Sequence, residues 1–77
     1  MVFEKVREVI SVQLGIPEEK IKMTTSLTGD LGADSLDILQ VVSELEEIFD
    51  LEFSNEDAEK LKVIADVVKH IEDRIED

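Results

Sequence analysis

Residues 32–37, Gly-Ala-Asp-Ser-Leu-Asp, hold the side chains best placed to take part in chemistry. They set one hydroxyl between two carboxylates, at the point where an apolar helical pattern begins. A serine needs an adjacent base to act as a nucleophile. The chain has no cysteine and only one histidine, His70, which lies far along the sequence near the C-terminus. We therefore predict that another protein modifies Ser35, rather than that Ser35 attacks a substrate.

The same residues also fit a purely structural role. Asp34 can cap a helix and Asp37 can reach back to it, which would make an acidic capping box. Both carboxylates would complement the positive end of the helix dipole, and matches this short recur by chance. A serine at a helix N-terminus, reached through a glycine-containing turn, also offers its hydroxyl where an ester-linked phosphate is favoured. On these residues alone both interpretations remain open.

The elements that position Ser35 belong to a small protein. Seventy-seven residues are enough for one domain, which we expect to span residues 1–77, and too few for two. Hydrophobic residues make up 43% of the chain, so it should fold rather than stay disordered. They are mostly Val, Ile and Leu, and such an aliphatic core can repack.

Helical spacing of apolar residues predicts helices over residues 2–14, from about 35 to 49, and from 64 to about 75. Gly15 and Pro17 should end the first. A capping box of Ser54 and Asp57 predicts a short helix near 55–61, whereas Lys62 and Val63 are poor N-caps for the last helix. The core stripe of the second long helix comprises Ile38, Val41, Val42, Leu45, Ile48 and Phe49.

Residues 15–34 show no long periodic pattern, although residues 17–20 could open one helical turn. We expect four apolar side chains to tie this long loop to the core: Ile21, Met23, Leu27 and Leu31. No strand-like alternation of useful length occurs. The predicted fold is all-α, a small four-helix bundle with three longer helices, a short third helix and a long loop between helices 1 and 2.

The charge is strongly acidic, with 20 Asp and Glu against 8 Lys and Arg and a net charge of −12. This argues against nucleic acid and anionic membranes as partners and favours basic proteins. Neither a secretory signal nor a transmembrane segment is visible, so we expect a cytoplasmic protein. A solvated acidic face would be the simpler explanation for the eleven acids that lie between Lys22 and Lys60 without one basic residue: Asp30, Asp34, Asp37, Glu44, Glu46, Glu47, Asp50, Glu52, Glu56, Asp57 and Glu59.

Residues 30–37, Asp-Leu-Gly-Ala-Asp-Ser-Leu-Asp, resemble the phosphopantetheine attachment site of acyl carrier proteins of type II fatty acid synthesis. The resemblance extends to Gln-Leu-Gly at 13–15, to Leu-Glu-Glu at 45–47 with Phe49 and Asp50, and to Glu-Asp-Ala-Glu-Lys at 56–60. It covers essentially the whole chain in one register.

The resemblance implies a carrier rather than an enzyme. A phosphopantetheinyl transferase would move 4′-phosphopantetheine from coenzyme A onto Ser35 Oγ, and the thiol of this arm would bear the growing acyl chain as a thioester. The carrier would work as a monomer and dock on fatty acid synthesis enzymes with basic patches through Asp34, Leu36, Asp37, Gln40, Glu46 and Glu47. It would enclose the acyl chain among Leu45, Phe49, Phe53, Ala58 and Leu61, residues that fit an ordinary core equally well.

Some positions depart from the fatty acid carriers. Gln40 stands where they often have Glu, Leu39 and Ser43 replace other small or medium apolar residues, and Phe53 and Ser54 replace Ile and Pro. A specialised carrier, for polyketide or another pathway, is therefore an alternative. A second alternative is an unmodified acidic helical adaptor that binds basic proteins, and it should tolerate Ser35→Ala.

No specific metal site is expected. Asp30, Asp34 and Asp37 lack the ligand spacing and the sixth-position glycine of a calcium-binding EF-hand loop. Loose binding of divalent ions to the acidic helix is more credible. His70 falls one position from the apolar stripe of the last helix, which predicts a solvated or dipole-facing side chain rather than a ligand or base.

Overall fold

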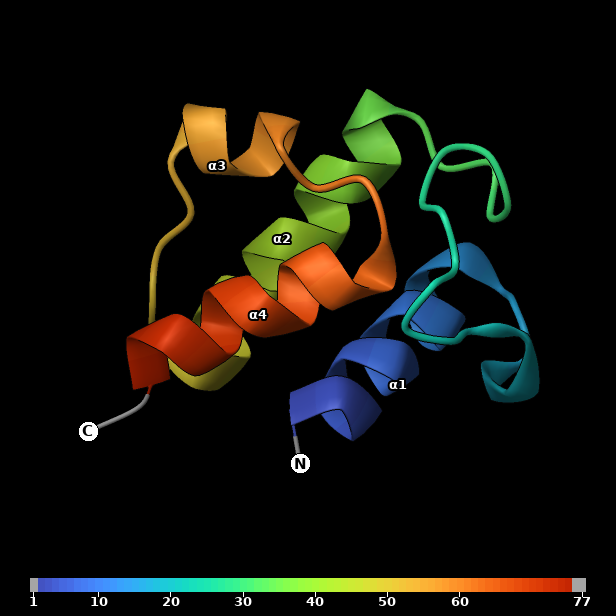
Figure 1. Ribbon diagram of the computed structural model, residues 1–77, viewed down its shortest axis with the longest axis horizontal. Helices are drawn as coiled ribbons and strands as arrows, with labels where there is room; N and C mark the ends of the chain where they lie inside the picture. Colours follow the sequence, from blue (N-terminus) through green and yellow to red (C-terminus); the bar gives the residue numbers. More distant parts are fainter. Residues whose placement is uncertain (1, 76–77) are drawn as a thin grey trace.

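The computed structural model describes residues 2–75 as helices joined by loops (Figure 1). The elements are α1 (Val2–Leu14), the 3₁₀ turn η1 (Glu18–Lys20), α2 (Ser35–Phe49), α3 (Asn55–Glu59) and α4 (Ile64–Ile75). Within these residues no strand forms, and the only β-type pairing is an isolated bridge between Ser26 and Val63. The all-α prediction is confirmed, although α3 ends two residues before the predicted position 61.

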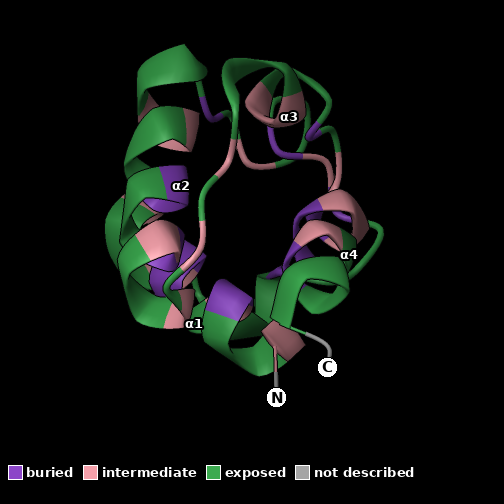
Figure 2. Ribbon diagram, turned by 90° about the vertical axis from the view of Figure 1, so that its left-hand side faces the viewer, coloured by how far each residue is buried: buried purple, intermediate pink, exposed green. Residues whose placement is uncertain are grey.

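The core lies where α1, α2 and α4 face one another, and Figure 2 shows the buried faces of these helices turned inward. Its most deeply buried side chains are aliphatic: Val6, Ile10, Ile21, Leu45, Ile64, Val67, Val68 and Ile71. α3 lies at one end of this arrangement, beside the start of α2 (Figure 1). The helices that position Ser35 therefore depend on one shared aliphatic core.

Backbone and side-chain caps set the helix ends. Gly15 adopts a positive φ of 68°, and its N–H donates to the Ser11 carbonyl at 2.9 Å, as expected of a glycine that ends a helix. Ser54 and Asp57 form the predicted capping box at the start of α3. α2 ends at Phe49, and the C-cap residue that follows, Asp50, adopts a left-handed conformation with φ 55°.

α4 begins by a different device. The carboxylate of Asp66, inside the first turn, accepts hydrogen bonds from the N–H groups of Lys62 (2.9 Å) and Val63 (3.1 Å). The cap thus comes from within the helix and reaches back, which explains why no suitable N-cap residue precedes α4. These two hydrogen bonds lower the pKa of the Asp66 carboxyl from its ordinary value of 3.8.

The loop between α1 and α2 is fastened mainly by its backbone. The Leu27 N–H donates to the Lys62 carbonyl (2.9 Å), and the Thr25 carbonyl accepts from Ile64 (3.0 Å). Ile21 and Leu27 are buried as predicted, and Leu31 is half-buried. The prediction for Met23 is wrong: its side chain is 41% exposed, and it is the Met23 carbonyl that holds the loop, by accepting from Ala65 (2.9 Å).

One position of the α2 stripe also differs from the prediction. Ile48 is 41% exposed, because it lies at the edge of the buried face, toward α1. Val41, Val42 and Leu45 occupy the centre of that face and are buried as expected.

Candidate functional site: the start of α2

Ser35 is the first residue of α2, and its side chain is exposed. The residues on either side of it form the capping box anticipated from the sequence. Asp37 N–H donates to Asp34 Oδ1 at 2.9 Å, and Asp34 N–H donates to Asp37 Oδ2 at 3.2 Å. Such reciprocal bonds fix the first turn, so the Ser35 hydroxyl stands on a defined backbone.

The turn before Ser35 is held equally firmly. Gly32 has a positive φ of 68°, a conformation that residues with a side chain rarely adopt. The next residue, Ala33, is buried, and its N–H donates to the Leu27 carbonyl at 2.9 Å. These two features fix the backbone conformation that leads into Asp34. As a result Ala33 packs inward and Ser35 faces solvent.

The electrostatics at Ser35 combine two opposing effects. Asp37 N–H bonds to the Asp34 side chain and Ile38 N–H to its carbonyl, which leaves the N–H groups of Ser35 and Leu36 as the outward donors of the first turn. They favour an anion attached at Ser35. The carboxylates of Asp34 and Asp37 oppose a free anion, so the site suits a phosphate held by a covalent bond.

An open cleft of about 640 Å³ lies beside Ser35, between the start of α2, α3 and the loop segments. Its volume falls in the usual range of small-molecule sites. Aliphatic and polar side chains both contribute to the lining, which comprises Ser26, Thr28, Ser35, Ile38, Leu39, Asn55, Ala58, Glu59, Leu61, Lys62 and Val63.

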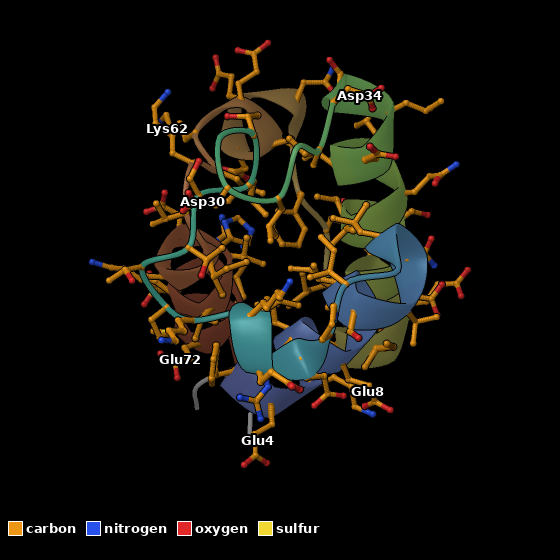
Figure 3. All side chains as sticks on the ribbon, turned by 90° about the vertical axis from the view of Figure 1, so that its right-hand side faces the viewer. Glu4, Glu8, Asp30, Asp34, Lys62 and Glu72 are labelled. Carbon is orange, nitrogen blue, oxygen red and sulfur yellow. The ribbon has the colours of Figure 1, made fainter. Side chains whose placement is uncertain are left out.

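Figure 3 shows the same end of the molecule with its side chains. Asp34 lies at the start of α2, Lys62 lies on the side of α3, and the loop that carries Asp30 runs between them. The Lys62 side chain points outward. Charged side chains therefore lie around this end of the molecule.

Two of the five residues predicted to enclose an acyl chain, Ala58 and Leu61, line this cleft. Leu45 is fully buried in the core, and Phe49 and Phe53 pack against that core, so these three lie apart from the open cleft. Sequence reasoning missed the contribution of Leu39 and Val63. The exposed position of Leu39 beside the α2 stripe was a usable signal for one of them, whereas Val63 joins the cleft only through loop pairing.

The residues predicted to dock on partners differ in how far they are exposed to solvent. Asp34, Leu36, Gln40 and Glu47 are exposed, Leu36 by 63%, while Asp37 and Glu46 are half-buried. The carboxylate of Glu46 accepts a hydrogen bond from the Phe53 N–H at 2.8 Å. Glu46 thus holds the connection to α3.

His70 corrects a prediction. Its side chain is only 10% exposed and stacks on Phe53, with ring centroids 4.0 Å apart and an interplanar angle of 17°. The residue one position from the α4 stripe therefore faces the segment before α3, not solvent. The Asp57 carboxylate lies 4.0 Å from His70 Nε2 and 3.7 Å from Arg74.

The pKa of Asp57 is lowered from its ordinary value of 3.8. The main cause is its hydrogen bonds with Ser54, from the backbone and then the side chain, and the charges of His70 and Arg74 add to it. The carboxylate that caps α3 is therefore the one that faces α4.

Residues 2–75 contain no helix long and apolar enough to cross a membrane. The same residues hold no group of three or more His, Cys, Asp or Glu side chains arranged to bind a metal ion.

Known proteins resemble this chain over nearly its full length. Residues 4–71 match the family described as "Phosphopantetheine attachment site". An acyl carrier protein of Clostridium acetobutylicum is 51% identical over 77 residues, which are 100% of both chains. An acyl carrier protein of Bdellovibrio bacteriovorus is 52% identical over 68 residues, covering 88% of this chain and 87% of that one.

A solved structure agrees with the sequence comparisons. It is a candidate acyl carrier protein from Mycobacterium tuberculosis, 33% identical, and it superposes with a TM-score of 0.83 over 90% of this chain and 92% of the other. Sequence and fold lead to the same assignment. The chain belongs to the acyl carrier protein family, whose members carry covalently attached 4′-phosphopantetheine.

Proposed function

We propose that Ser35 Oγ is the attachment point of the phosphopantetheine arm, and that the carrier presents fatty acyl groups to the enzymes of fatty acid synthesis. One observation carries the proposal: an exposed hydroxyl on the first residue of α2, held by a reciprocal cap, opens beside a cleft of about 640 Å³. As a member of this family the chain is a carrier, not a catalyst. When bound, the arm supplies a terminal thiol that holds the acyl group as a thioester.

We expect a phosphopantetheinyl transferase to catalyse the attachment, because the carboxylates of Asp34 and Asp37 beside Ser35 already accept backbone N–H groups in the capping box. The serine oxygen forms a new P–O bond, the pyrophosphate bond of coenzyme A breaks, and 3′,5′-ADP leaves. The transferase takes the serine proton. This chain contributes a hydroxyl on a backbone that the Asp34–Asp37 capping box fixes, and two outward N–H groups that favour the phosphodiester charge.

Docking on basic partners is supported by the charge of α2 and its surroundings. Leu36 supplies an exposed apolar contact next to Ser35, and Asp34, Gln40 and Glu47 are exposed around it. An acidic surface of this kind steers basic proteins at rates that fall with salt. Asp37 and Glu46 contribute charge, but they also hold the fold, so their replacement should weaken both docking and stability.

We also propose that residues 1–77 form a single domain, that the protein works as a monomer, and that it lies in the cytoplasm, as expected from the sequence. Service in fatty acid synthesis is favoured over a specialised pathway by the resemblance of residues 30–37. Gln40 and Phe53 depart from the usual fatty acid carriers. The rates of acyl transfer with enzymes of fatty acid synthesis and of a specialised pathway would therefore show which set of partners the protein serves.

Intact mass tests the proposal. The protein is incubated with coenzyme A and a broad-specificity phosphopantetheinyl transferase, beside Ser35→Ala and Ser43→Ala. Ser43 is an exposed serine on the same helix, so its replacement controls for a general effect on α2. We expect wild type and Ser43→Ala to gain one arm and Ser35→Ala to gain none. A gain that survives in a folded Ser35→Ala protein, for example at Ser26 in the same cleft, would overturn the assignment.

A further inference from the structure

Lys62 brings a primary amine to the cleft beside Ser35. The chain has six lysines, and Lys62 is the only one of them among the described residues that line this cleft. Lys60, two positions earlier, lines a separate hollow of about 190 Å³ between α3 and α4. The Ser35 cleft therefore holds the proposed attachment hydroxyl and one amine on the same surface.

The backbone of Lys62 is fixed on both sides, whereas its side chain is not. The Lys62 N–H donates to Asp66 Oδ2 at 2.9 Å, and the Lys62 carbonyl accepts from the Leu27 N–H at 2.9 Å. The residue is exposed, and within residues 2–75 its ammonium group makes no ion pair. The side chain points outward (Figure 3), but its four-carbon stem is flexible. The amine can therefore reach over the cleft from a fixed point on its wall.

The other nucleophilic groups in the lining are weaker. The cleft also holds the hydroxyls of Ser26 and Thr28, but a hydroxyl needs an adjacent base to attack. A lysine amine attacks a carbonyl carbon once it has lost its proton, and a thioester is a reactive acyl donor. An acyl thioester tethered at Ser35 therefore has one strong nucleophile within the same cleft.

We propose that Lys62 is a modification site that takes the acyl group from the arm in an intramolecular transfer. The inference rests on the proposed function, with the thioester carried on an arm at Ser35. Neutral Lys62 Nζ attacks the thioester carbonyl carbon, a C–N bond forms, and the C–S bond breaks with its electron pair going to sulfur. The nitrogen loses one proton to water, and the thiolate takes one up. The products are an amide on Lys62 and a free thiol, which can be loaded again.

The tether sets the expected rate. A short flexible linker gives an effective concentration on the order of millimolar. Transfer to Lys62 should therefore run about 100-fold faster than transfer from about 10 µM acyl-coenzyme A to the Ser35→Ala protein. Most lysine amines carry a proton at neutral pH, so the rate should rise about tenfold for each unit of pH.

The test starts from the arm-bearing protein loaded with a short straight-chain acyl group, with the loading checked by intact mass. The protein is incubated at several pH values and then treated with neutral hydroxylamine, which cleaves thioesters and leaves amides. Proteolysis and tandem mass spectrometry locate the acyl mass that remains. We expect it on Lys62, formed at a rate that rises with pH and does not change when the protein is diluted.

Lys62→Arg keeps the positive charge and the backbone hydrogen bonds but removes the amine. After the same incubation it should carry no acyl group that resists hydroxylamine, and Lys62→Gln should behave in the same way. Lys60→Arg is the matched control, because Lys60 is also exposed but lies outside the lining of the Ser35 cleft. It should keep the wild-type rate of transfer. Circular dichroism checks that each variant is folded.

A resistant acyl group spread evenly over several lysines, or present equally in Lys62→Arg and wild type, would overturn the inference. Complete removal of the acyl group by hydroxylamine at every pH would overturn it too, as would a rate that falls on dilution. These results leave the proposed function intact, since the loaded arm is verified before the incubation. A protein that gains no arm at Ser35 would overturn both.

Discussion

Replacement of Asp34 separates the two roles that its carboxylate plays beside Ser35. Asp34 Oδ1 accepts the Asp37 N–H at 2.9 Å, and the same carboxylate contributes charge to the docking face. Asp34→Ala removes both. Loss of an N-cap acceptor costs about 1 kcal/mol, in a range of about 0.5–2 kcal/mol, and a domain of this size loses about 4–8 °C in melting temperature per kcal/mol. We therefore expect Asp34→Ala to melt about 4–8 °C below wild type.

Asp34→Asn removes the charge and keeps the cap, because asparagine ranks with aspartate as an N-cap residue. The lost attraction to the helix dipole is offset by weaker repulsion in a chain of net charge −12. Its stability should therefore stay within about 0.5 kcal/mol of wild type, whereas arm transfer should slow and lose salt dependence. Asp73→Asn, an exposed acid on α4, is the control for charge alone.

The assay is thermal unfolding followed by far-ultraviolet circular dichroism, together with the initial rate of arm transfer at two salt concentrations. Two results would contradict these expectations. An Asp34→Asn protein that loses as much stability as Asp34→Ala would show that the side-chain cap is not what stabilises the turn. An unchanged transfer rate in Asp34→Asn would show that the charge plays no part in transferase docking.

Three further predictions concern the fold. Leu45→Ala should cost about 2–5 kcal/mol, a large part of the roughly 4–12 kcal/mol expected for 77 residues; denaturant unfolding measures it, and a loss below 1 kcal/mol would contradict the core assignment. The pKa of Asp66 is lower in the folded state than its ordinary 3.8, so the stability it adds is present above that value and lost as pH falls through the lowered pKa. The melting temperatures of wild type and Asp66→Asn should hence converge on acidification below 3.8, and a constant gap would argue against the cap. Millimolar Mg²⁺ should raise the melting temperature more than sodium chloride of equal ionic strength, by relieving repulsion among the acids; a melt indifferent to Mg²⁺ would count against loose divalent binding.

The parts of the fold that could be predicted are those coded by residues close together in the sequence. The caps of α2 and α3 each need two residues three positions apart. The sequence shows both pairs directly: Asp34 with Asp37, and Ser54 with Asp57. α4 has a local cap too, but its acceptor, Asp66, lies inside the helix and reaches backward, so the residues that precede α4 carry no sign of it.

The parts that could not be predicted depend on contacts between distant segments. His70 lies one position from an apolar stripe, and periodicity alone cannot tell that Phe53 will lie against it. The cleft has the same origin, because the backbone pairing of Leu27 with Lys62 and of Thr25 with Ile64 brings its loop walls together. Five residues were expected to enclose an acyl chain. Only Ala58 on α3 and Leu61 just after it line the cleft.

Peptide mapping of the protein isolated from cells that make it would show whether Ser35 carries the arm. Proteolysis and tandem mass spectrometry would locate the added mass residue by residue. We expect one phosphopantetheine, on Ser35 and on no other hydroxyl. An arm on any other residue, or a protein without one in cells whose transferase modifies a known carrier, would contradict it.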